Sequence, residues 1–183
     1  MPKNYVCQVT NRSIPRDSIY RFVASADNRI CFDASHELEG KTLFVSDEED
    51  IVRTWLDNQF LSCYFGFEIS REVILMQIIG YFYSRMLTFI AFAKKSGKLQ
   101  HGKSKIEEIL RSAPKNSAII QAKDASLREK FKIADIPIIE IFSSDELSSI
   151  IGAEMVKYII IYEEFASTIL ALEKKYKFFN EQQ

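Results

Sequence analysis

The feature that most constrains the fold is a long apolar stretch, Val73 to Ala93, in the middle of the chain. Its 21 residues are roughly enough to cross a bilayer. The stretch also contains polar, small and charged residues, namely Gln77, Gly80, Ser84, Arg85 and Thr88. An arginine near the centre of a bilayer costs about 2.5–3.5 kcal/mol even on the most lenient scale. The sequence therefore favours a pair of buried helices joining two domains, with no membrane partner.

Before this stretch the pattern is typical of a small β structure. Strand-like runs at Ile19–Ala24 and Arg29–Asp33 are separated by Ala26-Asp27-Asn28, which predicts a hairpin, and 43–45 is a third strand candidate. Ser46, with Glu49 three residues later, predicts the N-cap of a helix that continues to about Phe60. Ser70 is a second N-cap candidate and opens the apolar stretch.

After the stretch, strands and helices alternate as in a layered α/β structure. The predicted strands are 98–100, 118–122, 137–142 and 156–162. The predicted helices are 103–112, 126–132, 144–150 and 164–178. The expected fold is therefore α/β, with two small domains joined by a helical segment. An α+β domain spans residues 1–70, and a three-layer α-β-α sandwich with a small mixed sheet spans residues 71–183.

Charge is distributed unevenly along the chain. Residues 1–70 carry 7 basic and 11 acidic side chains, a net charge of −4, and residues 71–183 carry 17 and 14, a net charge of +3. Lys94 to Lys132 holds 11 basic and 4 acidic side chains, a net charge of +7. One stretch of the chain is therefore strongly basic, and the rest is neutral or acidic.

Residue types that carry chemistry are sparse. The three cysteines are far apart and form no C-x-x-C pair, and there are two histidines, so the sequence predicts no metal site, no disulfide framework and no cofactor. Phosphate-binding, dinucleotide-binding and hydrolase motifs are absent, which argues against an enzyme. Free cysteines indicate a reducing compartment. The first residues form no apolar segment typical of a signal peptide, and a cytoplasmic location is expected.

The most informative segment runs from Ala93 to Leu110. A helix is expected to end in Lys94 and Lys95, a glycine turn adds Lys98, and a new helix is expected to begin near Gly102 with Lys103 and Lys105 in its first turn. A helix N-terminus attracts phosphate through its N–H groups and its dipole, whereas cations there are unfavourable for the helix. Binding of a polyanion would explain these lysines, and an ordinary solvated surface would be equally compatible with them.

Four motifs in this half resemble the kink-turn-binding ribosomal-protein superfamily, in particular its YlxQ-like members. They are S-G-K-L-x-x-G at 96–102, D-A-S at 124–126, I-P at 136–137, and S-x-x-E-L-x-x-x-I-G at 143–152. The resemblance implies the three-layer sandwich and an RNA-binding surface at the Gly102 helix start and the Phe142-Ser143 loop. Members read RNA with Asn and Glu after the glycine, where this chain has Ser104 and Lys105. Lysine donates and cannot accept, so the resemblance implies phosphate contacts more than base recognition.

The first domain is similar to the bacterial YlxR family. The matching segments are Cys7-Gln8-Val9-Thr10, Pro15 to Phe22, and Gly40 to Val45. Fusion of the two modules implies a bacterial, non-enzymatic RNA-binding protein that binds structured RNA such as ribosomal or another stable non-coding RNA. On this resemblance the first domain would contribute Arg12, Arg16, Arg21 and Lys41.

An alternative function follows from the acidic first domain and its aromatic residues. Phe60, Tyr64, Phe65 and Phe67 could form an exposed anchor patch of a protein–protein adaptor in the transcription or translation machinery. The sequence favours instead an ordinary interdomain core, and the exposure of these residues in the structure distinguishes the two cases.

Overall fold

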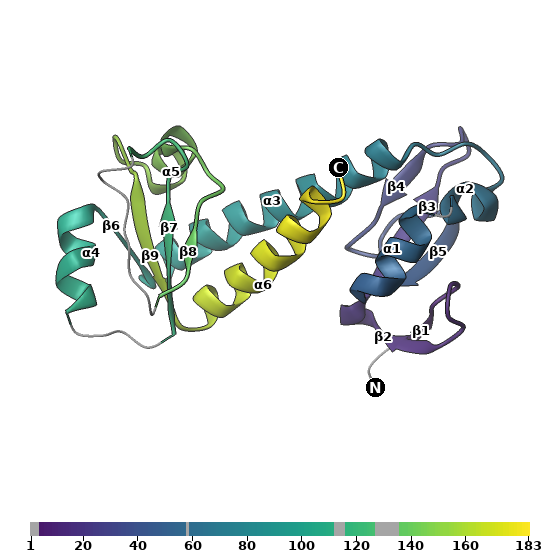
Figure 1. Cartoon of the computed structure of the whole chain (residues 1–183), viewed down its shortest axis with the longest axis horizontal. Helices are drawn as coiled ribbons and strands as arrows, with labels where there is room; N and C mark the ends of the chain where they lie inside the picture. Colours follow the sequence, from purple (N-terminus) through teal and green to yellow (C-terminus); the bar gives the residue numbers. More distant parts are fainter. Residues whose placement is uncertain (1–3, 58, 112–115, 127–135) are drawn as a thin grey trace. The chain divides into compact units, whose positions relative to one another are not determined.

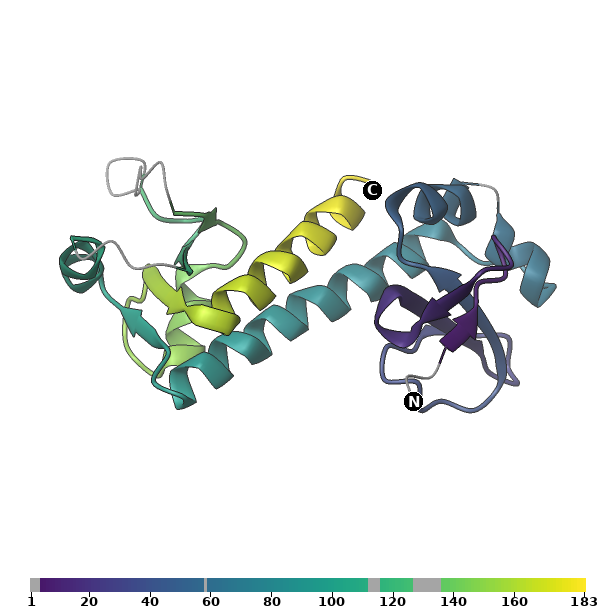
Figure 2. The same cartoon turned by 90° about the horizontal axis from the view of Figure 1, so that it is seen from below.

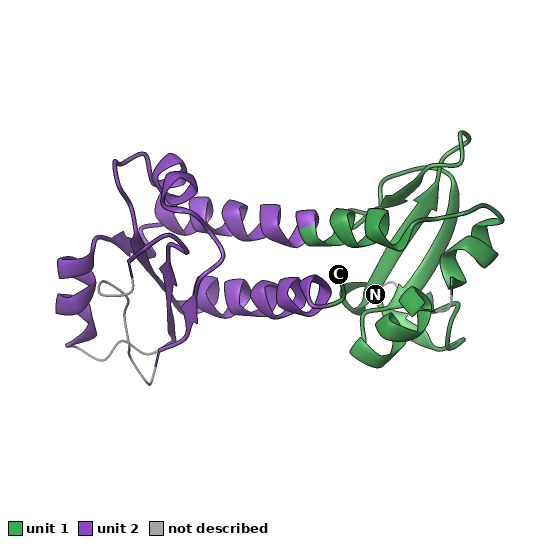
Figure 3. Cartoon of the chain, turned by 45° about the horizontal axis from the view of Figure 1, so that its top comes forward, with its two compact units in different colours: residues 1–79, 182–183 green, residues 80–181 purple. Residues whose placement is uncertain are grey.

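The computed structural model describes residues 4–57, 59–111, 116–126 and 136–183. The chain divides into two compact units, residues 1–79 with 182–183 and residues 80–181 (Figure 3). The division falls inside a single helix, α3 (Arg71–Lys95), whereas the sequence placed the domain boundary just before it, at residue 70.

Unit 1 is built on antiparallel strands. β1 (Asn4–Val6) pairs with β2 (Ser13–Pro15), and a second sheet has the order β4-β3-β5, with β3 at Ile19–Ala24, β4 at Ile30–Phe32 and β5 at Lys41–Ser46. The predicted hairpin is confirmed, because Val23 lies opposite Cys31 across the turn. A 3-10 turn (Arg16–Ser18) connects the two sheets.

The helices of unit 1 cover the second sheet. Val52 and Trp55 of α1 (Glu49–Asp57) and Ile74 and Ile78 of α3 are buried together with Phe22 and Leu43 of the sheet. The single helix predicted to continue from Ser46 to Phe60 is instead α1 followed by α2 (Phe60–Phe65). Ser46 belongs to β5, and its hydroxyl accepts from the backbone N–H of Glu48 at 3.2 Å.

The predicted pair of helices in the apolar stretch is wrong, because α3 is one helix of 25 residues. Gly80 does not interrupt it: a glycine inside a helix reduces stability by about 1 kcal/mol without breaking the hydrogen-bond ladder. Gln77 of α3 forms hydrogen bonds with the backbone at the edge of β4. Its side-chain amide accepts from Phe32 N–H (2.7 Å) and donates to the Ile30 carbonyl (3.0 Å).

Unit 2 has a mixed sheet of order β6-β9-β7-β8, in which only β7 and β8 run parallel. The strands are β6 (Leu99–His101), β7 (Ser117–Gln121), β8 (Ile138–Ile139) and β9 (Tyr158–Tyr162). All five residues of β7 are buried, so this strand is covered on both faces. The α/β prediction is therefore confirmed.

In the described part of unit 2, three helices follow the strands: α4 (Lys103–Leu110), α5 (Ser144–Ile151) and α6 (Glu163–Asn180). Figure 1 shows α4 on one side of the sheet, and α3 and α6 on the other. In both Figure 1 and Figure 2, α6 runs beside the part of α3 that belongs to unit 2, where Phe82 stacks on Phe179. The helix predicted at 126–132 lies outside the described residues except for Ser126.

The three cysteines are free, with Cys7 buried and Cys63 exposed. Within the part of the chain that the structure describes, no three His, Cys, Asp or Glu side chains are grouped so that they could hold a metal ion.

Candidate nucleic-acid interface

The helix start predicted at Gly102 lies at one end of the unit 2 sheet. β6 pairs with β9 so that His101 is opposite Ile159, and Gly102 then donates its N–H to the Tyr158 carbonyl at 3.1 Å. Gly102 has a φ of 94°, a conformation that glycine adopts without steric cost. It offers no side chain to cap α4, and no acidic residue lies in the first turn. The partial positive charge of this helix end is therefore not offset by the helix itself.

Backbone hydrogen bonds bring three further segments to the same end of the sheet. Ala122 N–H donates to the Lys157 carbonyl and Lys123 N–H to the Phe142 carbonyl, both at 2.8 Å. Ser144 donates to the Asp124 carboxylate through its N–H (2.8 Å) and its hydroxyl (2.5 Å). We call this surface the α4–α5 edge, and it comprises residues 102–105, 122–125, 142–144 and 155–158.

The start of α5 is held by a network that reaches α3. Ser143 is the N-cap and accepts from Glu146 N–H, while the Glu146 carboxylate accepts from the Ser143 N–H at 2.8 Å. The Tyr83 hydroxyl of α3 also donates to Glu146, and the Tyr83 ring lies 5.2 Å from that of Phe142. The predicted loop residues Phe142 and Ser143 are thus held from two helices.

Two carboxylates at this edge have altered acidity. Burial alone would raise the pKa of Glu146, but the hydrogen bonds from Tyr83 and Ser143 outweigh it and hold that pKa below its usual value. The Ser144 side-chain and backbone donors lower the pKa of Asp124. Both groups are therefore ionised at neutral pH: Asp124 links its turn to Ser144, and Glu146 links the start of α5 to α3.

The structure separates the predicted lysines into two groups. The first group, Lys103 and Lys105, belongs to the α4–α5 edge together with Ser104. The Lys103 ammonium lies 6.0 Å from the Tyr158 ring centroid. Lys98 lies at the other end of β6, where its carbonyl accepts from Tyr162 N–H at 3.2 Å. About 13 Å of extended chain separates Lys98 from Gly102.

Two lysines of the second group have structural partners. The Lys98 ammonium is 2.7 Å from a Glu163 carboxylate oxygen, and this hydrogen bond raises the pKa of Lys98. Lys94 donates to the Ile150 carbonyl at 3.4 Å, near the C-terminus of α5, where a cation is favourable. Lys95 is exposed at the end of α3. Of the lysines predicted to bind RNA, Lys94 and Lys98 therefore have protein partners of their own.

Three residues of this edge were not predicted from the sequence. Lys123 and Lys157 come from the turn after β7 and the segment before β9. Met155 is the most exposed of the large apolar side chains described, at 79%, and has a φ of 54°. Lys123 lies in the basic stretch and beside the D-A-S motif, which was the available signal. Lys157 and Met155 join the edge only through the pairing of β9 with β6 and β7.

The basic residues predicted in unit 1 have mostly structural roles. Arg21 forms an ion pair with Asp33, and the side chains are only 12% and 2% exposed. Arg16 donates to the Ser35 carbonyl at 2.8 Å, and Lys41 donates to the Tyr64 carbonyl at 2.5 Å while lying 4.9 Å from the Tyr64 ring centroid. Arg12 is exposed. Arg21 in particular is too enclosed to reach a nucleic acid.

The aromatic patch considered for a protein adaptor is not an exposed surface. Phe65 is buried, and Phe60, Tyr64 and Phe67 are partly buried in unit 1. The Tyr64 hydroxyl donates to the Thr42 carbonyl at 2.9 Å, and its ring meets Phe65 edge to face at 5.1 Å. These residues are part of the packing of unit 1.

Comparison with known proteins gives limited information. No family model matches the chain. No curated protein matches it either. A solved structure, described as a cytosolic protein of unknown function coded by a gene from the NUSA/INFB region and a YlxR homologue, is 13% identical. The likeness covers 38% of this chain and 74% of that one with a TM-score of 0.36, which is too weak to support an argument about fold or function.

Proposed function

We propose that this chain is a non-enzymatic RNA-binding protein and that unit 2 binds structured RNA through the α4–α5 edge. The observation that carries the proposal is the start of α4. The helix begins at Gly102, which has no side chain to cap it. Its first turn contains Lys103 and Lys105 and no acidic residue. Lysines at that position oppose the helix dipole, and a bound phosphate would interact favourably with both.

The surroundings of the α4 start suit a phosphate backbone. Lys123 and Lys157 come from the neighbouring segments of the edge, so four lysines belong to one surface. The N–H groups at the start of α4 complement these point charges with directed donors. An extended polyanion would contact several of these groups at once, which a single small anion could not do.

The edge favours contacts with phosphates and with unpaired bases over readout of base pairs. Lys105 has donors only and Ser104 is short, so neither side chain offers the paired amide or carboxylate geometry that reads a base edge. Met155 adds an exposed apolar side chain beside the lysines. RNA loops and bulges present unstacked bases that pack against such side chains, whereas a regular duplex does not.

The test compares two double variants that remove the same charge from opposite ends of β6. Lys103→Gln/Lys105→Gln alters the α4–α5 edge, and the control Lys95→Gln/Lys98→Gln alters the α3–β6 corner. Binding is measured over a salt series with stable RNA hairpins, with and without an internal bulge, and with DNA hairpins of the same sequence.

We expect the wild type and the control to bind the bulged RNA most tightly. With four phosphate contacts, the slope of log affinity against log salt should be roughly −3. The edge variant should weaken binding and reduce the magnitude of that slope by about 1.5. A slope near zero for the wild type on every hairpin, or equal losses in the two double variants, would contradict the proposal.

A further inference from the structure

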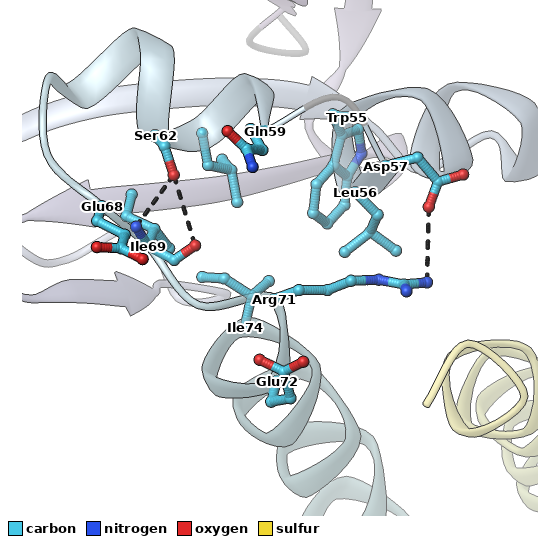
Figure 4. A pocket seen from close by; sticks show the side chains of 11 residues that line it. Trp55, Leu56, Asp57, Gln59, Ser62, Glu68, Ile69, Arg71, Glu72 and Ile74 are labelled. Carbon is cyan, nitrogen blue, oxygen red and sulfur yellow. Dashed lines mark hydrogen bonds and ion pairs between the residues drawn. The ribbon is translucent and has the colours of Figure 1, made fainter.

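A cavity of about 530 Å³ opens in unit 1, between α1, α2 and the start of α3 (Figure 4). Its volume lies within the range typical of ligand-binding pockets. All of its lining residues belong to unit 1, so the cavity is independent of the α4–α5 edge. Neither the proposed RNA contacts nor the packing of the sheet accounts for it.

The deepest residues of the cavity are apolar, while polar side chains make up the larger part of its exposed lining. Trp55, Leu61 and Ile74 line it and are between 1% and 5% exposed, and Leu56 lies beside them. The Trp55 ring is fixed by an edge-to-face contact with Phe22, with 5.3 Å between the ring centroids. The apolar surface that an entering group could cover therefore belongs mainly to Leu56, Leu61 and the partly exposed Ile69.

The wall opposite Trp55 is also well defined. The Ser62 hydroxyl accepts from Ile69 N–H at 3.0 Å and lies 3.4 Å from the Ile69 carbonyl, which ties the segment before α3 to α2. Figure 4 shows these two hydrogen bonds on one side of the cavity and the Arg71–Asp57 ion pair on the other. The cavity is therefore bounded by contacts within unit 1 on both sides.

The rim of the cavity is acidic. Asp57, Glu68 and Glu72 line it together with a single cationic side chain, Arg71, and the Arg71 guanidinium lies 3.6 Å from Asp57. Glu68 and Glu72 are exposed, and the hydrogen bond from Ser70 lowers the pKa of Glu72. Unit 1 as a whole has 8 basic and 12 acidic side chains, a net charge of −4. A phosphate backbone would be repelled here, whereas a cationic segment would be attracted.

We propose that this cavity is a docking site for a basic segment of a partner protein. One apolar side chain of the segment, of the size of leucine or phenylalanine, enters the cavity and packs on Leu61 and Ile69, over Trp55. Lysine or arginine residues next to it pair with Glu68 and Glu72 at the rim. The proposal goes beyond RNA binding and gives unit 1 a partner of its own.

The experiment uses the full-length chain and short capped peptides. One peptide has a central leucine flanked by lysines, a second has alanine in place of the leucine, and a third has glutamates in place of the lysines. Trp55 is the only tryptophan in the protein, so its fluorescence and the NMR signal of its indole N–H report directly on the cavity.

We expect a saturable change at Trp55 with the leucine–lysine peptide. The alanine peptide should bind roughly tenfold more weakly because it buries less apolar surface, and the glutamate peptide should not bind. The variant Glu68→Gln/Glu72→Gln should weaken binding by about fivefold, since two exposed ion pairs are lost. The control Glu37→Gln/Glu39→Gln removes the same charge from exposed positions outside the cavity and should bind like the wild type.

Three outcomes would overturn the proposal. The first is no saturable change at Trp55 up to about 1 mM leucine–lysine peptide. The second is equal binding of the leucine and alanine peptides, or equal losses in the two glutamate variants, which would indicate nonspecific charge attraction. The third is a saturable change at Trp55 on addition of the bulged RNA hairpin without peptide, which would make the cavity part of a nucleic-acid site.

Discussion

At the scale of single residues, Arg21 shows how burial changes the role of a charged side chain. Its guanidinium pairs with Asp33 and donates to the Leu38 carbonyl at 2.7 Å and the Thr42 hydroxyl at 3.3 Å. Asp33 also accepts from Leu38 N–H at 3.0 Å. The pair therefore holds the segment after β4 against β3 and β5, and it is the centre of a structural network in unit 1.

Removal of one partner from this pair should be strongly destabilising. Arg21→Ala leaves the Asp33 carboxylate enclosed without its cation, and we expect the free energy of unfolding to fall by about 3 kcal/mol. Arg29→Ala is the matched control, because Arg29 pairs with Asp27 at 2.8 Å on an exposed surface. Urea unfolding followed by Trp55 fluorescence measures both variants. Equal stability of the two variants would show that Arg21 has no structural role.

At the scale of secondary-structure elements, the start of α5 is stabilised both by local hydrogen bonds and by a contact from α3. The sequence predicted a helix that begins at Ser144, whereas the structure has a capping box one residue earlier, at Ser143 and Glu146, with the S-x-x-E spacing typical of that motif. The hydrogen bond from Tyr83 adds a contact from α3 that no local pattern encodes. Burial, and then this hydrogen bond, raise the pKa of Tyr83, so it remains a donor at neutral pH.

The capping box makes the stability of unit 2 depend on pH. The pKa of Glu146 is lower in the folded chain than its ordinary value of 4.5, so its ionised form stabilises the fold. That contribution is complete above pH 4.5 and is lost as the pH falls through the folded-state pKa. We therefore expect Glu146→Gln to be less stable than the wild type at pH 7, by a difference that shrinks below pH 4.5.

Urea unfolding of both proteins between pH 3 and pH 7, followed by circular dichroism, would measure this difference. Asp145→Asn, at the exposed neighbouring position, is the control and should change stability much less. A difference between Glu146→Gln and the wild type that is constant with pH would exclude a role for the ionised carboxylate.

At the scale of the whole molecule, α3 supplies core residues to both units. Ile74, Leu75 and Ile78 are buried in unit 1, and Met86 and Ile90 are buried in unit 2. By length and composition the helix could cross a membrane, and 33% of its most apolar window is buried. Insertion into a bilayer would remove these side chains from both cores, so we expect α3 to remain with the folded units.

Flotation with neutral phosphatidylcholine vesicles tests this expectation. The protein should stay in the unbound fraction, because burial of Arg85 in hydrocarbon and the loss of two cores both oppose insertion. Neutral lipid is the appropriate choice, since the lysines of unit 2 could attract anionic vesicles without insertion. Stable association with neutral vesicles would show that α3 leaves the fold to enter the membrane.

Much of the secondary structure could be predicted from local patterns. The strand at Ile19–Ala24, the end of α3 at Lys95 and the Gly152 stop of α5 were predicted within a residue, because alternation, caps and glycine stops act over a few positions. The break expected within α3 was wrong, since helix continuity there depends on packing against the cores.

The sequence by itself determined the α/β class, the excess of positive charge after residue 94 and the lysine-rich helix start at Gly102. Only the tertiary structure decided which charges lie together. Strand pairing brings Lys157 to Gly102 and leaves Lys98 at the far end of β6 beside Glu163. Packing within unit 1 encloses Arg21 and leaves the cavity between α1, α2 and the start of α3. These outcomes depend on contacts between residues far apart in the chain, which neither periodicity nor composition records.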